Sequence, residues 1–496
     1  MIKIYIKSRK KIMSLIICLS ILSSCGNKYK NISSTTGWKI NESKNGGFEA
    51  ELNFKEEIPL GMVFIEGGSF TMGQTEEDIL NDNNANPRKV SVASFYMDET
   101  EVTNVAYREY LFWLKRIYFG SYPNVYWNAL PDTNSWRSEL GFNDPLINNY
   151  LRHAGFSHYP VVGVSWDQAQ DYCLWRTDRV NELALIEAGA LKHNTDQVDD
   201  ISFNTETYLS GQYTGETKKG YKDLRNTKNK KGRVGNLYDG VIIANYRLPT
   251  EAEWEFAAWG NIGNSIEENI SDGRYYPWDR NSVRDNRKKF QGELLANFKR
   301  GSGDNMGISG SLNDAGARTM QVRSFPPNDY GLYDIVGNAA EWVLDIYRPS
   351  TSNQDDFMPF RGNVYKDKAK DEEGYYLEPD SLGRLQKVKA KSDSERRNYN
   401  KADNSSFMDG DLESSIYYDK EGTDEQLMYD YGKSTLINDN VHVYKGGSWM
   451  DRAYWLNPGS RRFLNSNIGK PNIGFRCVRD RMGSQNLNPN LKKAKN

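Results

Sequence analysis

The sequence contains very little histidine and cysteine. Of its 496 residues, four are histidine and four are cysteine, so we do not expect a metal site built from several histidines. The chain also lacks an excess of charge of one sign, because 64 lysines and arginines nearly balance 66 aspartates and glutamates. A net charge of −2 gives no electrostatic footprint for nucleic acid, and we expect no nucleic-acid partner.

Hydrophobic residues are also scarce, at 38% of the chain, below the roughly 45% that is usual for globular proteins. Aromatic side chains offset this scarcity, with 12 Trp, 31 Tyr and 19 Phe, and they occur beside 42 glycines. Chains that stay disordered contain few such rings. The composition therefore predicts a folded, loop-rich protein with an aromatic core. Length alone would predict about three domains of ~150 residues each.

The only long apolar run lies at the N-terminus, after a basic segment. Residues 12–22 are apolar, about half the ~20 residues that a membrane span requires. The run ends in Leu-Ser-Ser-Cys-Gly, which resembles a bacterial lipobox with Cys25 as the acylated residue. We expect a lipoprotein signal peptide over residues 1–24 and a mature chain that is soluble apart from its anchor. The alternative is an ordinary signal peptide with a stray cysteine.

Cleavage before Cys25 would leave two further cysteines, Cys173 and Cys477. In an oxidising compartment, two thiols permit one disulfide. The alternative is a pair of buried free thiols.

The rest of the chain divides by composition. Residues 25–60 are polar and predict a tether, dense patterning runs over 61–481, and 482–496 form a polar tail. Two polar stretches, about 190–240 and 350–440, interrupt the patterned region and predict insertions. The second insertion is expected to be either partly disordered or a partner-binding segment.

Local patterns predict several elements. Alternation around a Gly-Gly pair predicts a hairpin over 62–73, and residues 94–104 and 159–166 predict further strands. Three helices have N-terminal capping patterns: Thr103 before Val105, Tyr110, Leu111 and Leu114; Ser165 with Gln168; and Thr250 with Glu253.

Seven motifs occur in a recognisable order: EGGSFTMG, DETEVTN, YPVVGVSW, RLPTEAEWE, YGLYDIVGNAAEW, GGSW and IGFRC. Together they resemble the formylglycine-generating, or sulfatase-modifying factor, family. This resemblance implies an α+β, C-type-lectin-like fold with little regular secondary structure. It also implies one large domain over 61–481, in place of the three that the length suggests.

A second resemblance is narrower. The lipobox and the segments TTGWKINESKNGGF, PVVGVSWDQAQDYCLWRTDRVNE and RGNVY are similar to the GldJ family of gliding-motility lipoproteins in Bacteroidetes. Its paralogues, GldK and PorK, belong to the ring of the type IX secretion system. The resemblance implies a lipoprotein of the outer membrane, on its periplasmic face, with gliding and secretion proteins as partners. The segment after the lipobox favours GldJ over GldK.

The catalytic residues of the larger family are absent. Its enzymes use two copper-binding cysteines shortly after the GGS motif, and here Asp451 and Leu456 stand at those positions. Neither side chain provides the thiolate that Cu(I) and the thiol substrate require. A serine hydrolase is not indicated either, since the chain has no GxSxG elbow. We expect no catalytic residue, no enzymatic activity and no copper.

Two other groups of residues call for an interpretation. His153 and His158 are five apart, which does not place both on one helical face, so they are expected to be ordinary loop histidines rather than metal ligands. Arg476 is expected to pair with a buried carboxylate rather than to hold a substrate.

The family resemblance also implies structural bonds. It implies a disulfide between Cys173 and Cys477, and two structural Ca²⁺ sites. The first site would use Asn297, the Phe298 carbonyl, Asp314 and the Gly316 carbonyl; the second would use Asp334, the Gly337 and Ala339 carbonyls, and Glu341. Such a mixture of oxygens suits calcium. Asp334 stands where the family has asparagine, which keeps an oxygen, and ordinary Asx turns are the alternative.

Three classes of function remain open. The first is a lipid-anchored, catalytically inactive scaffold of the gliding and type IX secretion machinery. The second is a formylglycine-type oxidase, against which the missing cysteines argue. The third is a glycan- or peptidoglycan-binding module, in which tryptophan and tyrosine would stack on sugars. Because the same rings are needed for the core, the first class is favoured.

Overall fold

A computed structural model was analysed. It describes residues 31–45, 48–51, 54, 56–74, 85, 87–138, 141–218, 220–221, 224, 235–260, 274–278, 282–300, 316–347, 366–389, 416–418, 426–428 and 440–483. Cys25 and Asp314, which the sequence selects for lipid and calcium, lie outside these ranges. Within them, no helix combines the length and the apolar composition needed to cross a membrane.

The chain forms two compact units. The smaller combines Met1–Lys55 with Leu183–Asn194 and Glu216–Ile242, so part of the first predicted insertion folds with the N-terminal segment. Inside this unit, the backbone N–H of Leu224 donates to Glu49 Oε1 over 2.6 Å. The larger unit comprises Glu56–Glu182, Thr195–Gly215 and Ile243–Asn496 and carries the predicted family motifs.

Two four-stranded sheets form the centre of the larger unit. In one, the strand order is β1 (Met62–Ile65), β4 (Phe95–Asp98), β14 (Val478–Asp480) and β5 (Tyr246–Arg247), and all pairs are antiparallel. In the other, the order is β12 (Arg462–Asn465), β11 (Val441–Lys445), β6 (Ala340–Ile346) and β13 (Ile473–Gly474), with β13 parallel to β6. The segment 473–480, which begins with the last motif, thus supplies a strand to each sheet.

Three short antiparallel pairs complete the strands of the described ranges. They are β2 (Gly68–Met72) with β3 (Arg88–Val92), β7 (Lys366–Lys368) with β8 (Lys387–Lys389), and β9 (Ile416–Tyr418) with β10 (Gln426–Met428). The β7–β8 pair lies inside the second predicted insertion, so part of that insertion is folded.

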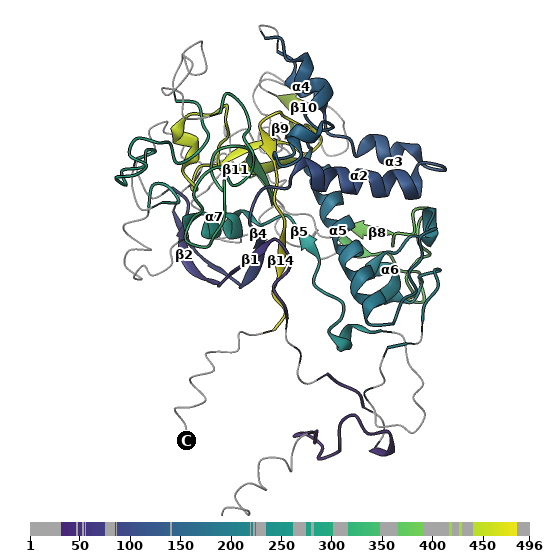
Figure 1. Cartoon of the computed structure of the whole chain (residues 1–496). Helices are drawn as coiled ribbons and strands as arrows, with labels where there is room; N and C mark the ends of the chain where they lie inside the picture. Colours follow the sequence, from purple (N-terminus) through teal and green to yellow (C-terminus); the bar gives the residue numbers. More distant parts are fainter. Residues whose placement is uncertain are drawn as a thin grey trace, which may run out of the picture. The chain divides into compact units, whose positions relative to one another are not determined.

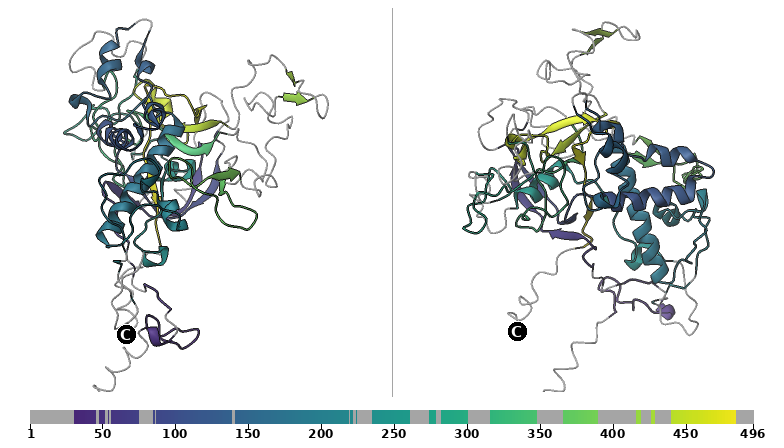
Figure 2. Two further views of the ribbon diagram at one scale, coloured as in Figure 1. Left: turned by 90° about the vertical axis from the view of Figure 1, so that its right-hand side faces the viewer. Right: turned by 45° about the horizontal axis from the view of Figure 1, so that its top comes forward.

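The helices of the described ranges are α2 (Asn104–Tyr118), α3 (Pro123–Asn128), α4 (Asp144–Asn149), α5 (Trp166–Glu187), α6 (Thr205–Ser210) and α7 (Glu251–Trp259). Of these, α2, α3, α5 and α6 gather on one side of the strands, whereas α7 lies among the strands and contacts β2, β3 and β6 (Figures 1 and 2). Short 3₁₀ turns occupy Ser43–Asn45, Thr133–Trp136, Ala154–Phe156, Asp199–Ile201, Leu237–Asp239 and Ala453–Leu456. Long connections without regular structure join these elements, as the composition predicts.

The predicted helix starts are confirmed. The Thr103 side chain accepts from the N–H of Ala106, Ser165 and Gln168 form a reciprocal capping box, and Thr250 and Glu253 form another. Such caps satisfy backbone donors that a helix leaves free at its first turn. One detail of the first helix is wrong: Val105 is exposed, and Tyr107 takes its place in the buried face.

Two strand predictions are wrong. Residues 62–73 form no hairpin, because β1 pairs with β4 while β2 pairs with β3. The chain changes partner at Gly67, where a Cβ would lie 2.4 Å from the Val92 carbonyl oxygen, so only glycine allows this close crossing. Residues 159–166 are buried at Val161, Val162 and Val164 but make only an isolated bridge at Pro160 instead of a strand.

The interior is aromatic, as the composition predicts. One cluster is centred on Trp254 and Phe95, and a second on Tyr107 and Trp342, all of them buried. Rings in the second cluster meet in stacked and edge-to-face pairs, for example Tyr107 and Tyr172 with centroids 5.7 Å apart. Many of the aromatic residues in the described ranges therefore serve packing.

A network of buried charges joins α7 to the second sheet. Glu251 accepts from Arg461 over 2.7 Å and pairs with Lys445 over 3.3 Å, while Lys445 also pairs with Glu255 over 2.8 Å. Burial alone would raise the pKa of Glu251, but the Arg461 and Lys445 charges lower it to about 2. Asp345 of β6 accepts from the backbone N–H of Glu251 over 2.6 Å, and burial raises its pKa to about 8.

Candidate functional site

The two positions to which the family resemblance assigns catalytic cysteines, 451 and 456, lie between β11 and β12. Asp451 receives two hydrogen bonds from the Arg462 guanidinium, at 2.6 and 2.8 Å, and a third from the Ser448 hydroxyl. A bidentate arginine–carboxylate pair is among the strongest charged contacts in proteins. The carboxylate at this position is therefore held in the fold by local partners.

Leu456 occupies the second position and is fully buried in the first core cluster. It ends the 3₁₀ turn Ala453–Leu456, and its side chain lies near the backbone of Gly447, since a Cβ built there would be 3.2 Å from Leu456 Cδ2. A buried leucine offers no metal ligand and no nucleophile. Together, the ion pair and the leucine occupy the two positions to which the resemblance assigns copper-binding thiolates.

Arg476 pairs with a buried carboxylate, as the sequence predicts, and its partner is Glu341. Its Nε lies 2.9 Å from Oε1 and 2.7 Å from Oε2, and its Nη2 lies 2.6 Å from Oε1. Trp254 Nε1 also donates to Glu341 Oε2 over 2.8 Å. Both carboxylate oxygens of this predicted calcium ligand are thus engaged by the protein itself.

The other predicted side-chain ligands within the described ranges fit a cation better. Oδ1 of Asn297 and Oδ1 of Asp334 are buried and have no hydrogen-bond partner among the described residues. Leaving such an oxygen unsatisfied is costly, and a cation would satisfy it. Burial raises the pKa of Asp334 to about 6, and burial, followed by the neighbouring Asp334, raises the pKa of Glu101 well above its ordinary value.

Backbone geometry around the second predicted site is also unusual. Asp334 and Asn338 have φ of +51° and +58°, a region that residues other than glycine rarely adopt. Across the described ranges, no three His, Cys, Asp or Glu side chains come together to hold a metal ion by themselves. A calcium ion here would therefore depend on main-chain carbonyls, such as those predicted at Phe298, Gly316, Gly337 and Ala339.

Cys173 and Cys477 lie side by side. Cys173 is on α5, and Cys477 lies just before β14 rather than within a strand. Their sulfurs are 3.5 Å apart, and both thiols are free and fully buried in the structure. A disulfide bond requires sulfurs about 2.05 Å apart. The disulfide therefore stays a prediction, for which the chain places both ends correctly.

The two histidines lie in the loop after α4. His153 Nδ1 accepts from the backbone N–H of Gly155 over 3.1 Å and so caps the turn Ala154–Phe156. The backbone carbonyl of His158 accepts from the N–H of Val322. Both observations fit the structural role that their spacing predicts.

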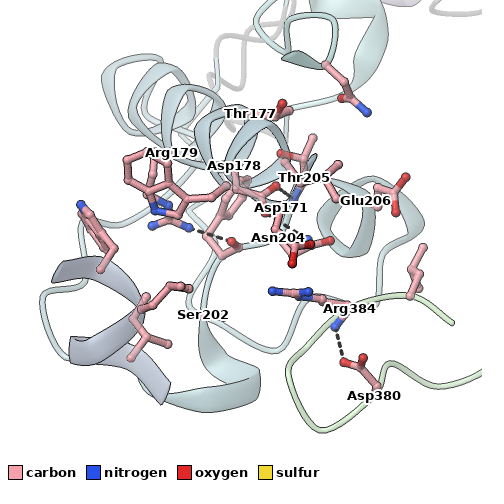
Figure 3. Close-up of a pocket in the computed structure, with 18 of the residues that line it drawn as sticks. Asp171, Thr177, Asp178, Arg179, Ser202, Asn204, Thr205, Glu206, Asp380 and Arg384 are labelled. Carbon is pink, nitrogen blue, oxygen red and sulfur yellow. Dashed lines mark hydrogen bonds between the residues drawn. The ribbon is translucent and has the colours of Figure 1, made fainter. Parts of the chain in front are cut away.

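A cavity of about 500 Å³ lies elsewhere, among α2, α5, α6 and the loop 380–387 (Figure 3). Several charged groups around it have local structural partners. Asp178 accepts from the N–H of Thr205 over 2.8 Å and from Asn204 over 3.1 Å, at the start of α6. Arg179 donates to the Phe203 carbonyl over 2.8 Å, and Asp380 accepts from two N–H groups of its own loop.

Sequence reasoning did not find this cavity. Its walls come from segments more than 200 residues apart, including residues 380–387 of the second predicted insertion. No local motif connects α2 with a polar loop so far along the chain. One weak indication of a polar site was present in the sequence: the second predicted insertion contains Asp380 and Arg384 close together.

The sequence also matches a protein family over most of its length. The profile of the sulfatase-modifying factor enzyme 1-like domain matches residues 50–481. The chain belongs to the sulfatase-modifying factor family. This membership confirms the predicted α+β, loop-rich fold class.

Relatives of the chain include a formylglycine-generating enzyme and a protein described as inactive. The formylglycine-generating enzyme of Mus musculus is 25% identical over 333 residues, which cover 62% of this chain and 64% of that enzyme. The inactive C-alpha-formylglycine-generating enzyme 2 of Mus musculus is 25% identical over 331 residues, covering 62% of this chain and 75% of the relative. The chain thus spans just under two thirds of the length of the active mouse enzyme.

Solved structures with similar chains include PvdO from Pseudomonas aeruginosa and Treponema denticola variable protein 1. Their sequence identities are 16% and 18%, and each comparison covers 85% of this chain. They cover 94% and 95% of those chains, with TM-scores of 0.39 and 0.37. Scores this low carry no functional meaning, and membership of the sulfatase-modifying factor family rests on the sequence match.

Proposed function

We propose that this protein is a catalytically inactive, lipid-anchored scaffold of the gliding-motility and type IX secretion machinery, of the GldJ type. One observation carries the inactive part of the proposal. Asp451 is held by Arg462, and Leu456 is buried, at the two positions where the enzymes of the family need thiolates. A domain that keeps the fold but has lost its reacting groups is suited to binding other proteins.

The lipobox at Cys25 and the segments shared with gliding lipoproteins support the rest of the proposal. An acyl chain on Cys25 would hold the chain at the outer membrane, and the sequence after it, Gly-Asn-Lys-Tyr-Lys, has no acidic cluster. We place the protein on the periplasmic face, with GldK- or PorK-type lipoproteins and other ring components as partners. A formylglycine-type oxidase is the alternative that the residues at 451 and 456 oppose.

Copper binding tests the inactive part of the proposal. Titration of the mature protein with Cu(I) under a competing chelator should show no tight site. The double variant Asp451→Cys, Leu456→Cys provides the matched control, since it restores the thiolate pair in the same fold. Its melting temperature must first show that it folds, because the substitutions remove the ion pair with Arg462. Tight copper binding by the unaltered protein would overturn the proposal.

A glycan- or peptidoglycan-binding module is a second alternative. It would need aromatic faces open to a sugar, whereas many of the rings that the structure describes pack in the two core clusters. Sedimentation with purified peptidoglycan distinguishes the two, because a scaffold that binds proteins should remain in the supernatant.

We also propose that calcium and a disulfide stabilise this scaffold. The unsatisfied oxygens of Asn297 and Asp334 support the first, with Asp314 completing the first ligand set. The 3.5 Å approach of the Cys173 and Cys477 sulfurs supports the second. The ions would fix loops that have little hydrophobic core of their own, so metal binding would be coupled to folding.

A further inference from the structure

The cavity beside α5 contains three polar groups that the fold leaves unused. They are the hydroxyl of Tyr110 on α2, the carboxylate of Asp171 on α5 and the guanidinium of Arg384 in the loop 380–387, and all three line the cavity. Figure 3 shows the Arg384 guanidinium reaching into the space between its loop and α5. Among the described residues, none of the three groups has a hydrogen-bond partner for its side chain, in contrast to their neighbours Asp178 and Arg179.

The two charged groups attract each other without forming an ion pair. The positive charge of Arg384 lowers the pKa of Asp171, against the larger effect of desolvation by the cavity walls, which raises it. In turn, Asp171 is the main charge that raises the pKa of Arg384 against desolvation. No guanidinium nitrogen of Arg384 lies within 4.0 Å of a carboxylate oxygen of Asp171, which is the limit for a salt bridge. The cavity therefore holds a positive and a negative group apart.

Opposite charges without a partner on two walls of a cavity match a ligand with two opposite charges. Asp171 is exposed and Arg384 is half-buried, so both are accessible to a ligand that enters the cavity. An ammonium group at Asp171 and a carboxylate at Arg384 would satisfy both, and arginine can bind a carboxylate through two parallel hydrogen bonds. Burial raises the pKa of Tyr110, so its hydroxyl remains protonated and can donate a further hydrogen bond.

The rings around the cavity argue against a sugar. Sugar sites present an open aromatic face, but Trp113 has two guanidinium groups over its ring, Arg116 at 3.9 Å and Arg179 at 4.7 Å. Trp175 packs against Tyr110 with centroids 5.3 Å apart and against Tyr172 at 5.4 Å. Leu174 also lines the cavity and is 42% exposed, so it offers apolar surface to a ligand. It suits an aliphatic side chain.

We propose that this cavity binds a small zwitterion, a free amino acid or short peptide, with its ammonium group at Asp171 and its carboxylate at Arg384. The volume of about 500 Å³ lies within the range of small-molecule sites, roughly 300–1,000 Å³. This site is separate from Asp451 and Leu456, and it does not rest on the proposed scaffold role. It gives the domain a ligand-binding function that its lost catalytic positions do not provide.

Isothermal titration calorimetry on the detergent-solubilised mature protein tests the proposal. The probes are the standard L-amino acids, D-alanine and glycylglycine, with maltose as a neutral polyol. We expect at least one zwitterion to bind and maltose not to bind. The N-acetylated and the C-amidated forms of the bound probe should each bind about tenfold more weakly or worse, because each loses one charge-assisted contact.

Two variants connect the binding to its residues. Asp171→Asn and Arg384→Gln should each weaken binding of the same probe by about tenfold or more, while melting temperatures confirm that both fold. Asp167→Asn is the matched control: it lies one turn earlier on α5 and its carboxylate accepts from the Ser466 hydroxyl over 3.2 Å, outside the cavity. The proposal is wrong if no zwitterion binds, if maltose binds in its place, or if both cavity variants bind as the unaltered protein does.

Discussion

Arg476 and Glu341 form a fully buried ion pair in which three guanidinium–carboxylate contacts of 2.6–2.9 Å join strand β6 to the segment between β13 and β14. Arg476 also donates to the carbonyls of Asp98 at 3.1 Å and Tyr333 at 3.0 Å. One side chain therefore connects both sheets to the loop before β6. The family motifs YGLYDIVGNAAEW and IGFRC meet at this pair, which gives them a structural role independent of catalysis.

Removing the carboxylate should be strongly destabilising. Glu341→Ala leaves the Arg476 guanidinium buried without its partner, a change that typically costs about 3–5 kcal/mol. Urea unfolding followed by tryptophan fluorescence measures the loss. Glu109→Gln, an exposed carboxylate on α2, provides the control and should change stability by less than about 0.5 kcal/mol. A loss below about 1 kcal/mol for Glu341→Ala would show that the pair contributes little.

The effect of calcium on stability can be distinguished from that of the Arg476–Glu341 ion pair. If Asp334 Oδ1 binds a calcium ion, Asp334→Ala should lower the melting temperature in calcium and have a much smaller effect in excess EDTA. Glu341→Ala should be destabilising in both conditions, because the Arg476 pair does not need a metal. Differential scanning calorimetry with and without EDTA makes the comparison. Identical melting curves for the unaltered protein in both conditions, with no metal found by elemental analysis, would refute the calcium sites.

The cysteine pair predicts a specific chemical state. In the mature protein taken from the periplasm, Cys173 and Cys477 should resist alkylation after denaturation without reductant, and both should react after reduction. A bridge closing so long a loop would stabilise the fold by ~4 kcal/mol in the chain-entropy model. Mass spectrometry of the alkylated protein reads the result. Two alkylated thiols in the non-reduced sample would mean that the buried thiols remain free.

Buried carboxylates predict how stability depends on pH. The pKa of Asp345 is raised from 3.8 to about 8, so its contribution to stability is full below about pH 4 and is lost as pH rises through 8. The pKa of Glu251 is lowered from 4.5 to about 2, so its contribution is present above about pH 4.5 and is lost as pH falls through 2. Asp345→Asn should therefore flatten the decline in unfolding free energy between about pH 5 and pH 8.

Urea unfolding across that pH range measures this effect. The exposed Asp144, in the first turn of α4, provides a control, since Asp144→Asn should leave the slope unchanged. If Asp345→Asn keeps the slope of the unaltered protein, Asp345 does not retain its proton in the folded state.

The success of the sequence predictions depended on how local each feature is. The capping boxes at Ser165 and Thr250 were correct because a cap is formed by residues three apart. The predicted hairpin over 62–73 was wrong because β1 pairs with β4, and β2 pairs with β3, instead of with each other. The alternation of apolar and polar residues does not specify which strand becomes the partner.

The candidate functional site shows the same difference between local features, which the sequence predicts, and long-range contacts, which it does not. The absence of cysteine at positions 451 and 456 is visible in the sequence, but the ion pair between Asp451 and Arg462 is not. Glu341 was predicted as a calcium ligand and Arg476 as the partner of an unnamed carboxylate; only the fold shows that the two residues meet. Tyr110, Asp171 and Arg384 form one cavity only through long-range packing, so no pattern indicates them.

The scaffold account is tested most directly by affinity purification of the lipidated protein from outer membranes, with quantitative mass spectrometry of the chains that co-purify. The account predicts that gliding and type IX secretion components are enriched with the unaltered protein. It also predicts that Cys25→Ser, which removes the acylated residue, is released from the outer membrane and loses these partners. Equal recovery of membrane-bound protein with Cys25→Ser, or enrichment of a sulfatase in place of secretion components, would contradict it.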